Sequence, residues 1–218
     1  NGVNIGAIAQ GSTEKNISAV IATRDVRKAI NVLHEEFFET TYKQVNLFIT
    51  GTGNVGGKLL GQIQQELSFL QQKMRLQLRI IGLSNSRKMI FKEEGIDAAS
   101  WQQQLQDGEK ADLQKFVQGI IDRNLRNSVF VDITANEQVA SVYDQLLQKS
   151  ISVVACNKIA ASSAFTNYKK LKDLAGEYNC QFLFETNVGA GLPVIATLND
   201  LVRSGDRVHQ IDAVLSGT

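Results

Sequence analysis

The feature that most restricts the fold of this chain is a glycine-rich turn between an apolar strand and an amphipathic helix. Residues 51–56 read Gly-Thr-Gly-Asn-Val-Gly, and they follow the apolar run Val45–Ile49 almost directly. The predicted helix after the turn places apolar residues on one face, at offsets of three and four: Leu59, Ile63, Leu67 and Leu70. A GxGxxG pattern is informative only in this context. The context favours a dinucleotide-binding turn over a plain strand-to-helix connection.

Apolar strands and amphipathic helices alternate from residue 43 to residue 185. The predicted strands are Val45–Ile49, Leu76–Ile81, Val129–Val131, Ile151–Ala155 and Phe182–Phe184. Buried strands joined by helices predict a parallel sheet covered on both faces. Right-handed crossovers then give a doubly wound α/β fold, a parallel Rossmann sheet. The polar, Gln-rich stretch around Trp101 predicts no more than an excursion between two elements.

The two ends of the chain have the pattern of partial domains. Residues 1–42 contain one predicted strand, Ile17–Ile21, and a helix with apolar residues on one face: Val26, Ala29, Ile30, Leu33 and Phe37. One strand and one helix cannot close a core alone. In residues 186–218, Pro193 and Gly205 mark the start and end of a helix. Alternating apolar residues then predict a strand: Ile211, Ala213 and Leu215.

Composition excludes several classes of function. Lys and Arg total 23 against 22 Asp and Glu, a net charge of +1, which argues against a nucleic-acid partner. No apolar run approaches the ~18 residues of a membrane span. The N-terminus has no signal-peptide pattern, so we expect a cytoplasmic protein, and the missing initial Met suggests a piece of a longer chain. Cys156 and Cys180 form no disulfide framework, and two histidines make a His-rich metal site improbable.

Each glycine of the turn has a separate expected role. Gly51 permits the tight turn, Gly53 lets the backbone approach a pyrophosphate, and Gly56 lets helix and strand pack closely. The helix that begins at Asn54 and Val55 offers free N–H groups and a positive dipole end to the phosphates.

The end of the second predicted strand bears on the choice between NADP and NAD. NAD-selective domains place an acidic residue there to bind the ribose 2′-hydroxyl. This chain instead has Ser84, Ser86, Arg87 and Lys88, which suit a 2′-phosphate, so we favour NADP with NAD as the alternative. The other interpretation is that Arg87 and Lys88 are only the solvated start of a helix.

Polar residues also follow the third and fourth predicted strands. Because ligands of doubly wound sheets lie beyond the carboxyl ends of the strands, Thr134, Cys156, Asn157 and Lys158 should line the nicotinamide side of the crevice. An exposed lysine with no such role is the alternative for Lys158.

Several strings resemble homoserine dehydrogenase. They are residues 129–134, 157–160 and 184–195, together with the glycine-rich turn and the final residues 215–218, so that the resemblance covers about residues 45–218. Residues 8–20 resemble the end of an ACT regulatory domain of aspartokinase, although an unrelated strand–helix unit is the alternative. The order of these two segments along the chain resembles that of bifunctional aspartokinase/homoserine dehydrogenases. We therefore expect a partial ACT-like segment (1–42), an NAD(P)-binding Rossmann domain (43–185) and the start of an α+β substrate and dimerisation domain (186–218).

The resemblance implies an activity and site residues. It implies NADP(H)-dependent interconversion of L-aspartate 4-semialdehyde, a small-molecule substrate, and L-homoserine, in threonine and methionine biosynthesis. It implies a catalytic role for Lys158, by electrostatic help or proton transfer, and a homo-oligomer. Glu185 matches a position that helps to bind a monovalent cation such as sodium, with the backbone carbonyls of Val188, Ala190 and Leu192. The alternative for Glu185 is a hinge carboxylate bonded to the Gly189–Gly191 backbone.

In the family, the acidic substrate-binding residues and a second catalytic lysine lie C-terminal to this region, so we expect little or no turnover by these 218 residues and no kinase activity. Two alternatives stay open. One is an aspartate-semialdehyde type of dehydrogenase with Cys156 as the nucleophile, for which His209 is the only downstream histidine. The other is a non-catalytic regulatory module that senses a dinucleotide or an amino acid.

Overall fold

A seven-stranded sheet forms the centre of the computed structural model, which describes residues 3–11, 16–38 and 42–214. The strand order is β6-β5-β4-β3-β7-β8-β9. The strands are β3 (Lys43–Thr50), β4 (Leu76–Ser84), β5 (Lys88–Phe91), β6 (Glu109–Lys110), β7 (Ser128–Asp132), β8 (Ser152–Ala155) and β9 (Phe182–Leu183). Parallel pairing joins β4, β3, β7, β8 and β9, whereas β5 and β6 add an antiparallel edge.

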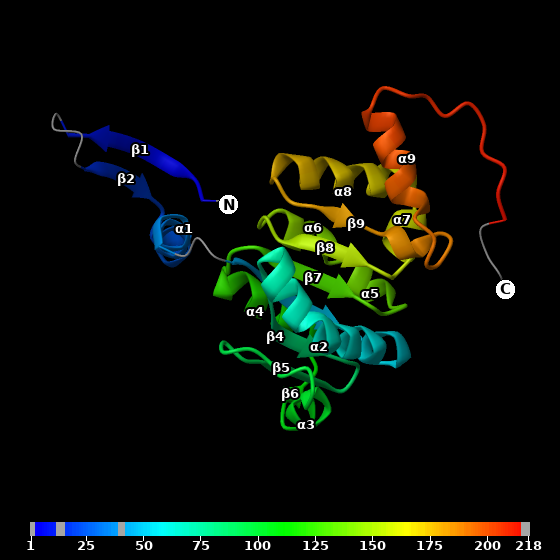
Figure 1. Cartoon of the computed structure of the whole chain (residues 1–218), viewed down its shortest axis with the longest axis horizontal. Coiled ribbons are helices and arrows are strands. Elements are labelled where there is room, and N and C mark those ends of the chain that lie inside the picture. Colours follow the sequence, from blue (N-terminus) through cyan, green and yellow to red (C-terminus); the bar gives the residue numbers. More distant parts are fainter. Residues whose placement is uncertain (1–2, 12–15, 39–41, 215–218) are drawn as a thin grey trace.

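Helices cover both faces of this sheet (Figure 1). On one face lie α2 (Asn54–Met74) and α3 (Trp101–Gln106). On the other lie α4 (Leu113–Arg123), α5 (Glu137–Ala140), α6 (Tyr143–Leu147), α7 (Ile159–Ser162) and α8 (Phe165–Glu177). Neighbouring residues of β3 point to opposite faces, so Phe48 belongs to the core under α4 and α6 while Leu47 and Ile49 belong to the core under α2. The predicted doubly wound α/β fold is confirmed.

The excursion around Trp101 has more structure than its sequence predicts. β5, α3 and β6 fold as an antiparallel addition to the edge of the sheet. Sequence patterning misses it because the strands are only four and two residues long, and α3 buries only Leu105. The spacing of Val139, Val142, Leu146 and Leu147 is typical of one helix, but the structure divides it into α5 and α6, because Val142 leaves helical geometry at φ −97° and ψ 0°.

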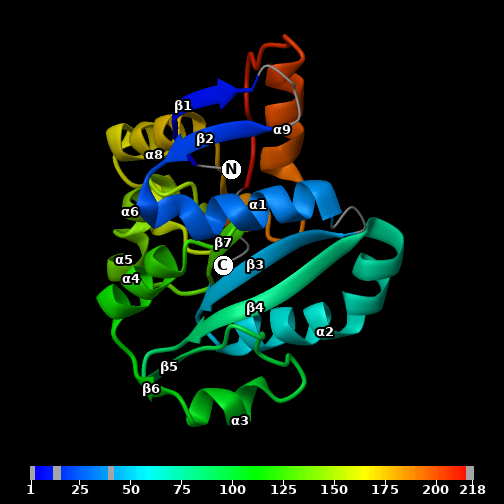
Figure 2. The same cartoon turned by 90° about the vertical axis from the view of Figure 1, so that its left-hand side faces the viewer.

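The N-terminal segment forms its own two-stranded sheet. β1 (Ile5–Gln10) pairs antiparallel with β2 (Ile17–Ile21), and a short 3₁₀ helix, η1 (Thr23–Asp25), leads into α1 (Val26–Phe38). Sequence analysis predicts β2 and α1 but not β1. Figure 2 shows α1 lying alongside the edge of the sheet where β3 begins. Asn124 donates to Asp25 at 3.2 Å, and Arg27 pairs with Glu93 at 3.5 Å, so this segment contacts the sheet through polar groups.

Beyond β9, a 3₁₀ turn, η2 (Glu185–Asn187), leads to α9 (Val194–Arg203). The predicted helix start at Pro193 and end at Gly205 agree with the structure, in which Gly205 has a φ of +95°. The strand predicted at Ile211 and Ala213 is wrong within the described residues: no strand pairs with this stretch, and Ile211 is 64% exposed. Leu215 lies outside the described residues. No helix in the described ranges is both long and apolar enough to span a membrane.

Candidate dinucleotide site at the carboxyl edge of the sheet

The glycine-rich turn joins the end of β3 to the start of α2, and its three glycines differ in what surrounds them. Gly51 has a φ of +101°, and a Cβ there would lie 2.6 Å from the carbonyl oxygen of Ile133. A Cβ on Gly56 would overlap the carbonyl oxygen of Gly51. Gly53, which caps α2, faces open space. The fold itself therefore requires Gly51 and Gly56, whereas Gly53 leaves room for a ligand beside the first free N–H groups of α2.

A groove of about 420 Å³ opens beside this turn. Its walls come largely from the ends of β3, β4 and β7 and the turns that follow them, and they include Thr52, Ser84, Ser86, Thr134 and Asn136. The groove lies where the strand order reverses, since the chain passes from β3 to β4 on one side and later returns to β7 on the other. Ligands of open α/β sheets bind at this type of crevice.

The turn after β4 brings only some of the predicted 2′-phosphate residues to the groove. Ser84 is buried and Ser86 lies on the wall. Asn85 organises the turn, because its Oδ1 accepts the N–H groups of Arg87 and Lys88, each at 2.8 Å. The Arg87 side chain is exposed next to the groove and has no hydrogen bond or ion pair within the described part of the chain. The Lys88 ammonium instead donates to the carbonyl of Gly108 at 2.8 Å.

A buried polar network, which sequence analysis does not identify, ties the ends of β7 and β8 together. The Asp132 side chain is fully buried. Its Oδ2 accepts from the Tyr143 hydroxyl at 2.5 Å and from Asn157 Nδ2 at 3.0 Å, and its Oδ1 accepts from the Thr134 N–H at 2.7 Å. Burial and the Asp132 carboxylate raise the pKa of Tyr143 well above its usual range. The one sequence signal for this network is Asp132 itself, an aspartate at the end of an otherwise apolar strand.

Of the predicted nicotinamide-side residues, Thr134 lines the groove, whereas Cys156, Asn157 and Lys158 are connected to it through this network but do not line it. Asn157 Nδ2 also donates to the carbonyl of Asn136 on the groove wall, at 3.0 Å. Cys156 is half-buried, and its N–H donates to the carbonyl of Asp132 at 2.8 Å. Lys158 comes directly after Asn157 and is the N-cap residue of α7. Its side chain is exposed, and its ammonium makes no hydrogen bond or ion pair with the residues that the structure describes.

Glu185 lies further along the same edge and holds the start of α9. Its Oε1 accepts the N–H of Ile195 at 2.9 Å, and its Oε2 accepts the N–H of Ala196 at 2.6 Å. These partners differ from the Gly189–Gly191 backbone considered from sequence. Among the described residues, no cluster of three or more His, Cys, Asp or Glu side chains forms a metal site.

The parallel sheet, the glycine-rich turn and the groove at the strand-order reversal define an NAD(P)-binding Rossmann domain. Comparison with known proteins identifies the family. Residues 51–185 match the model "Homoserine dehydrogenase, NAD binding domain", and residues 1–37 match an ACT domain. The chain belongs to the homoserine dehydrogenase family.

Two curated relatives show how much of a longer protein the chain represents. It is 38% identical over 218 residues to the chloroplastic bifunctional aspartokinase/homoserine dehydrogenase 1 of Arabidopsis thaliana, covering 99% of this chain and 24% of the relative. It is 35% identical over 217 residues to the bifunctional aspartokinase/homoserine dehydrogenase of Haemophilus influenzae, covering 99% of this chain and 26% of the relative. The chain thus spans about a quarter of the length of these relatives.

Solved structures agree with the fold. A hyperthermophilic archaeal homoserine dehydrogenase in complex with NADPH is 25% identical, with a TM-score of 0.58 over 72% of this chain and 48% of that one. The homoserine dehydrogenase of Thermoplasma acidophilum superposes with a TM-score of 0.59 at 19% identity, over 74% of this chain and 49% of that one. The second likeness shows the shared fold alone.

Proposed function

We propose that this chain supplies the NADP(H)-binding part of an enzyme that interconverts L-aspartate 4-semialdehyde and L-homoserine. One observation carries the proposal: the Gly53 turn and Lys158 lie on the same edge of the sheet, at the ends of strands on either side of β7. In this proposal residues 43–185 bind the dinucleotide, 1–42 are a partial ACT-like regulatory segment, and 186–218 begin the substrate and dimerisation domain. The enzyme would work as a homo-oligomer on this small-molecule substrate.

The residues that line the groove favour one orientation of a bound dinucleotide. A pyrophosphate beside Gly53 would meet the N–H groups of Asn54 and Val55 at the start of α2. The ribose 2′ position would then approach Ser84, Ser86 and Arg87. This stretch has no acidic side chain to bind a free 2′-hydroxyl, so we propose NADP(H) over NAD(H), with Arg87 as the principal 2′-phosphate contact. Lys88 has a minor role in this proposal, since Gly108 holds its ammonium. The NADPH bound by the archaeal relative supports this choice.

The other end of the groove fits the chemistry of a carbonyl reduction. When bound, the nicotinamide donates or accepts the hydride. Thr134 and Cys156 would border its ring, and the buried Asp132–Asn157 pair would hold the loop that carries Lys158. Lys158 would place its ammonium near the substrate oxygen, where it stabilises the developing alkoxide or supplies its proton. No hydrogen bond or ion pair within the described residues engages the Lys158 side chain, so it is free to contact the substrate.

We also propose a monovalent cation such as sodium between η2 and α9, held by Glu185 and by the carbonyls of Val188, Ala190 and Leu192. The donor set suits a hard cation, because it is made of oxygen atoms. The Glu185 carboxylate accepts two N–H bonds and has about four acceptor positions, so it retains capacity for a cation.

Fluorescence titration with NADPH and, separately, NADH tests the dinucleotide proposal. We expect saturable NADPH binding that Gly53→Asp abolishes by putting a carboxylate beside the pyrophosphate. Gly61→Asp is the matched control, because Gly61 also faces open space but lies two turns along α2, away from the groove. Arg87→Ala should weaken NADPH binding about tenfold and leave NADH binding unchanged. Unchanged NADPH affinity in Arg87→Ala, or an equal loss of NADPH and NADH affinity, would refute the 2′-phosphate contact. Binding of neither dinucleotide by the folded wild-type chain would refute the site.

A further inference from the structure

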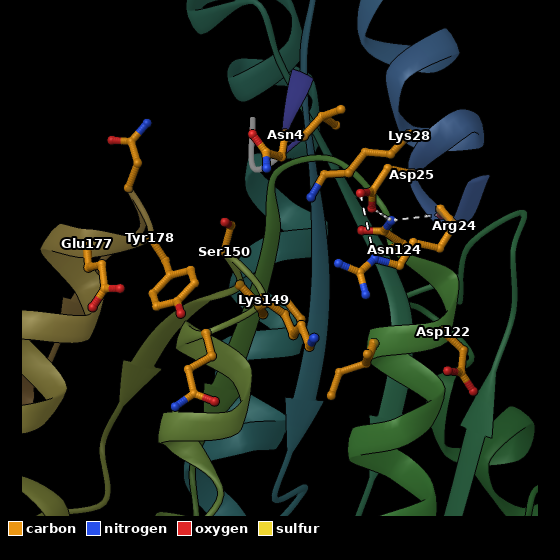
Figure 3. A pocket seen from close by; sticks show the side chains of 15 residues that line it. Asn4, Arg24, Asp25, Lys28, Asp122, Asn124, Lys149, Ser150, Glu177 and Tyr178 are labelled. Carbon is orange, nitrogen blue, oxygen red and sulfur yellow. Dashed lines mark hydrogen bonds and ion pairs between the residues drawn. The ribbon is translucent and has the colours of Figure 1, made fainter. Parts of the chain in front are cut away.

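A second cavity, of about 740 Å³, lies at the opposite edge of the sheet from the dinucleotide groove. One wall comes from the N-terminal segment, with Arg24 in η1 and Lys28 in α1. The other comes from loops that lead into β7, β8 and β9, with Asn124, Lys149 and Tyr178 (Figure 3). The glycine-rich turn follows a strand, whereas these loops precede strands, so the two sites are on opposite edges of the parallel sheet. The volume is within the range of small-molecule pockets, roughly 300–1,000 Å³.

Lys28 is the unusual residue of this cavity. It is only 6% exposed, and Figure 3 shows its ammonium pointing into the cavity. Within the described ranges it makes no hydrogen bond and no ion pair. A buried charge without a partner is costly, so such a group is normally paired or neutral. Burial lowers the pKa of Lys28, and nearby Asp25 opposes this shift.

The neighbouring carboxylates have partners of their own. Asp25 accepts from Asn124 Nδ2 at 3.2 Å and lies 3.8 Å from Arg24 Nε. Asp122 accepts from Gln118 Nε2 at 2.6 Å. Neither acid forms an ion pair with Lys28 among the described residues, so Lys28 lacks a direct partner on the inner surface of the cavity.

The remaining polar groups favour an anion beside Lys28. Lys149 adds a second ammonium, which is exposed and forms no hydrogen bond or ion pair in the part of the chain that the structure describes. Asn4, Ser150 and Tyr178 add neutral hydrogen-bond donors (Figure 3). Glu177 is the one lining carboxylate with no described partner, and Figure 3 shows it on the α8 side, across the cavity from Lys28.

We propose that this cavity binds a small anion with a carboxylate or phosphate group, which pairs with Lys28 and Lys149. Such a ligand would join the N-terminal segment to the dinucleotide-binding domain, because Lys28 belongs to the first and Lys149 to the second. It would bind independently of the dinucleotide, since the two sites share no lining residue.

Thermal melting and calorimetric titration with sodium phosphate and with sodium succinate, at ionic strength matched by sodium chloride, test this site. We expect a saturable rise in Tm for the wild-type chain. Lys28→Met should melt higher than wild type without added anion, because it removes an unpaired buried charge, and it should lose the anion-dependent rise. Lys149→Ala changes an exposed residue, so it should fold normally and weaken anion binding about tenfold.

The control variant is Lys73→Met, which makes the same chemical change at an exposed position in α2, outside the cavity. It should respond to the anions as wild type does. NADPH affinity should be the same in Lys28→Met and wild type. The proposal is overturned if neither anion has an effect beyond that of chloride, or if Lys28→Met and Lys149→Ala keep the wild-type response. It is also overturned if Gly53→Asp removes the response, which would assign the anion to the glycine-rich turn.

Discussion

Asn157 Nδ2 donates to Asp132 Oδ2 at 3.0 Å, and both side chains are buried. This bond joins the ends of two adjacent parallel strands, β7 and β8, directly beneath the loop that carries Lys158. Asp132 has no cation beside it in the described residues, and its charge is balanced by donors: the Tyr143 hydroxyl, the Asn157 amide and the Thr134 N–H. A carboxylate that accepts several hydrogen bonds in a dry site loses stability with each partner that is removed.

Removal of this carboxylate should be far more damaging than removal of one partner. Asp132→Ala leaves the Tyr143 hydroxyl and the Thr134 N–H without their acceptor, and Asn157 Nδ2 with only the Asn136 carbonyl, so we expect a loss of about 2–4 kcal/mol in the free energy of unfolding. Tyr143→Phe removes one donor and should cost about 1–2 kcal/mol. Urea denaturation followed by circular dichroism measures both. Equal effects of the two substitutions would contradict a network centred on Asp132.

The glycines of the turn should separate into structural and ligand-contacting positions. Gly56→Ala forces a Cβ into the Gly51 carbonyl, so we expect destabilisation by about 3 kcal/mol or more. Gly53→Ala meets open space and should leave the Tm within a few degrees of wild type.

NADPH titration completes the comparison. Gly53→Ala should weaken NADPH binding although it leaves the fold intact, because its methyl group occupies the approach to α2. Gly61→Ala, in open space on the same helix, controls for helix propensity and should bind normally. Full NADPH affinity in Gly53→Ala would show that the pyrophosphate does not pass over Gly53.

Sequence patterning anticipates the features that depend on local periodicity. The parallel strands, the long helices and the Gly51–Gly56 turn are all predicted, because burial on one or both faces leaves a clear pattern in consecutive residues. β1 is missed because Gly6, Ala7 and Ala9 give it little β-propensity, whereas β2 has Ile17, Val20 and Ile21. The antiparallel β5 and β6 are missed because they are too short to show alternation.

The candidate site likewise has residues that the sequence predicts and contacts that it does not. Gly53, Ser84 and Thr134 follow from strand ends and reach the groove as expected. The contact of Lys88 with Gly108 depends on β5, which sequence patterning misses, so its direction could not be inferred. The pairing of Asp132 with Tyr143 depends on a helix break at Val142 that no local sequence pattern predicts.

Cys180 should be an unreactive thiol with a marked pH dependence. Burial raises its pKa to about 11, and its Sγ donates to the carbonyl of Leu147 at 3.5 Å. We expect its alkylation by iodoacetamide, measured in a Cys156→Ser background, to be slow at pH 8 and to accelerate up to about pH 11 as the thiolate forms.

The same shift has a consequence for stability. The folded-state pKa of Cys180 is above the unfolded value of 9.0, so the folded state binds more protons between these two values. Its contribution to stability is therefore complete below pH 9 and is lost as the pH rises toward 11. Cys180→Ala should show a shallower fall in Tm over this range than wild type. Identical slopes would show that the thiol has the same pKa in both states.

Glu185 connects the end of the Rossmann sheet to α9, and its substitution should separate capping from cation binding. Glu185→Ala removes both acceptors of the Ile195 and Ala196 N–H groups, so we expect a loss of about 1 kcal/mol from the N-terminus of α9. Glu185→Gln keeps one carbonyl acceptor but not the negative charge, so it should cost less. Replacement of sodium chloride by choline chloride tests the cation. If Glu185 helps to hold sodium, wild type should melt lower in choline while Glu185→Gln shows little change; if Glu185 only caps α9, neither protein should distinguish the two salts.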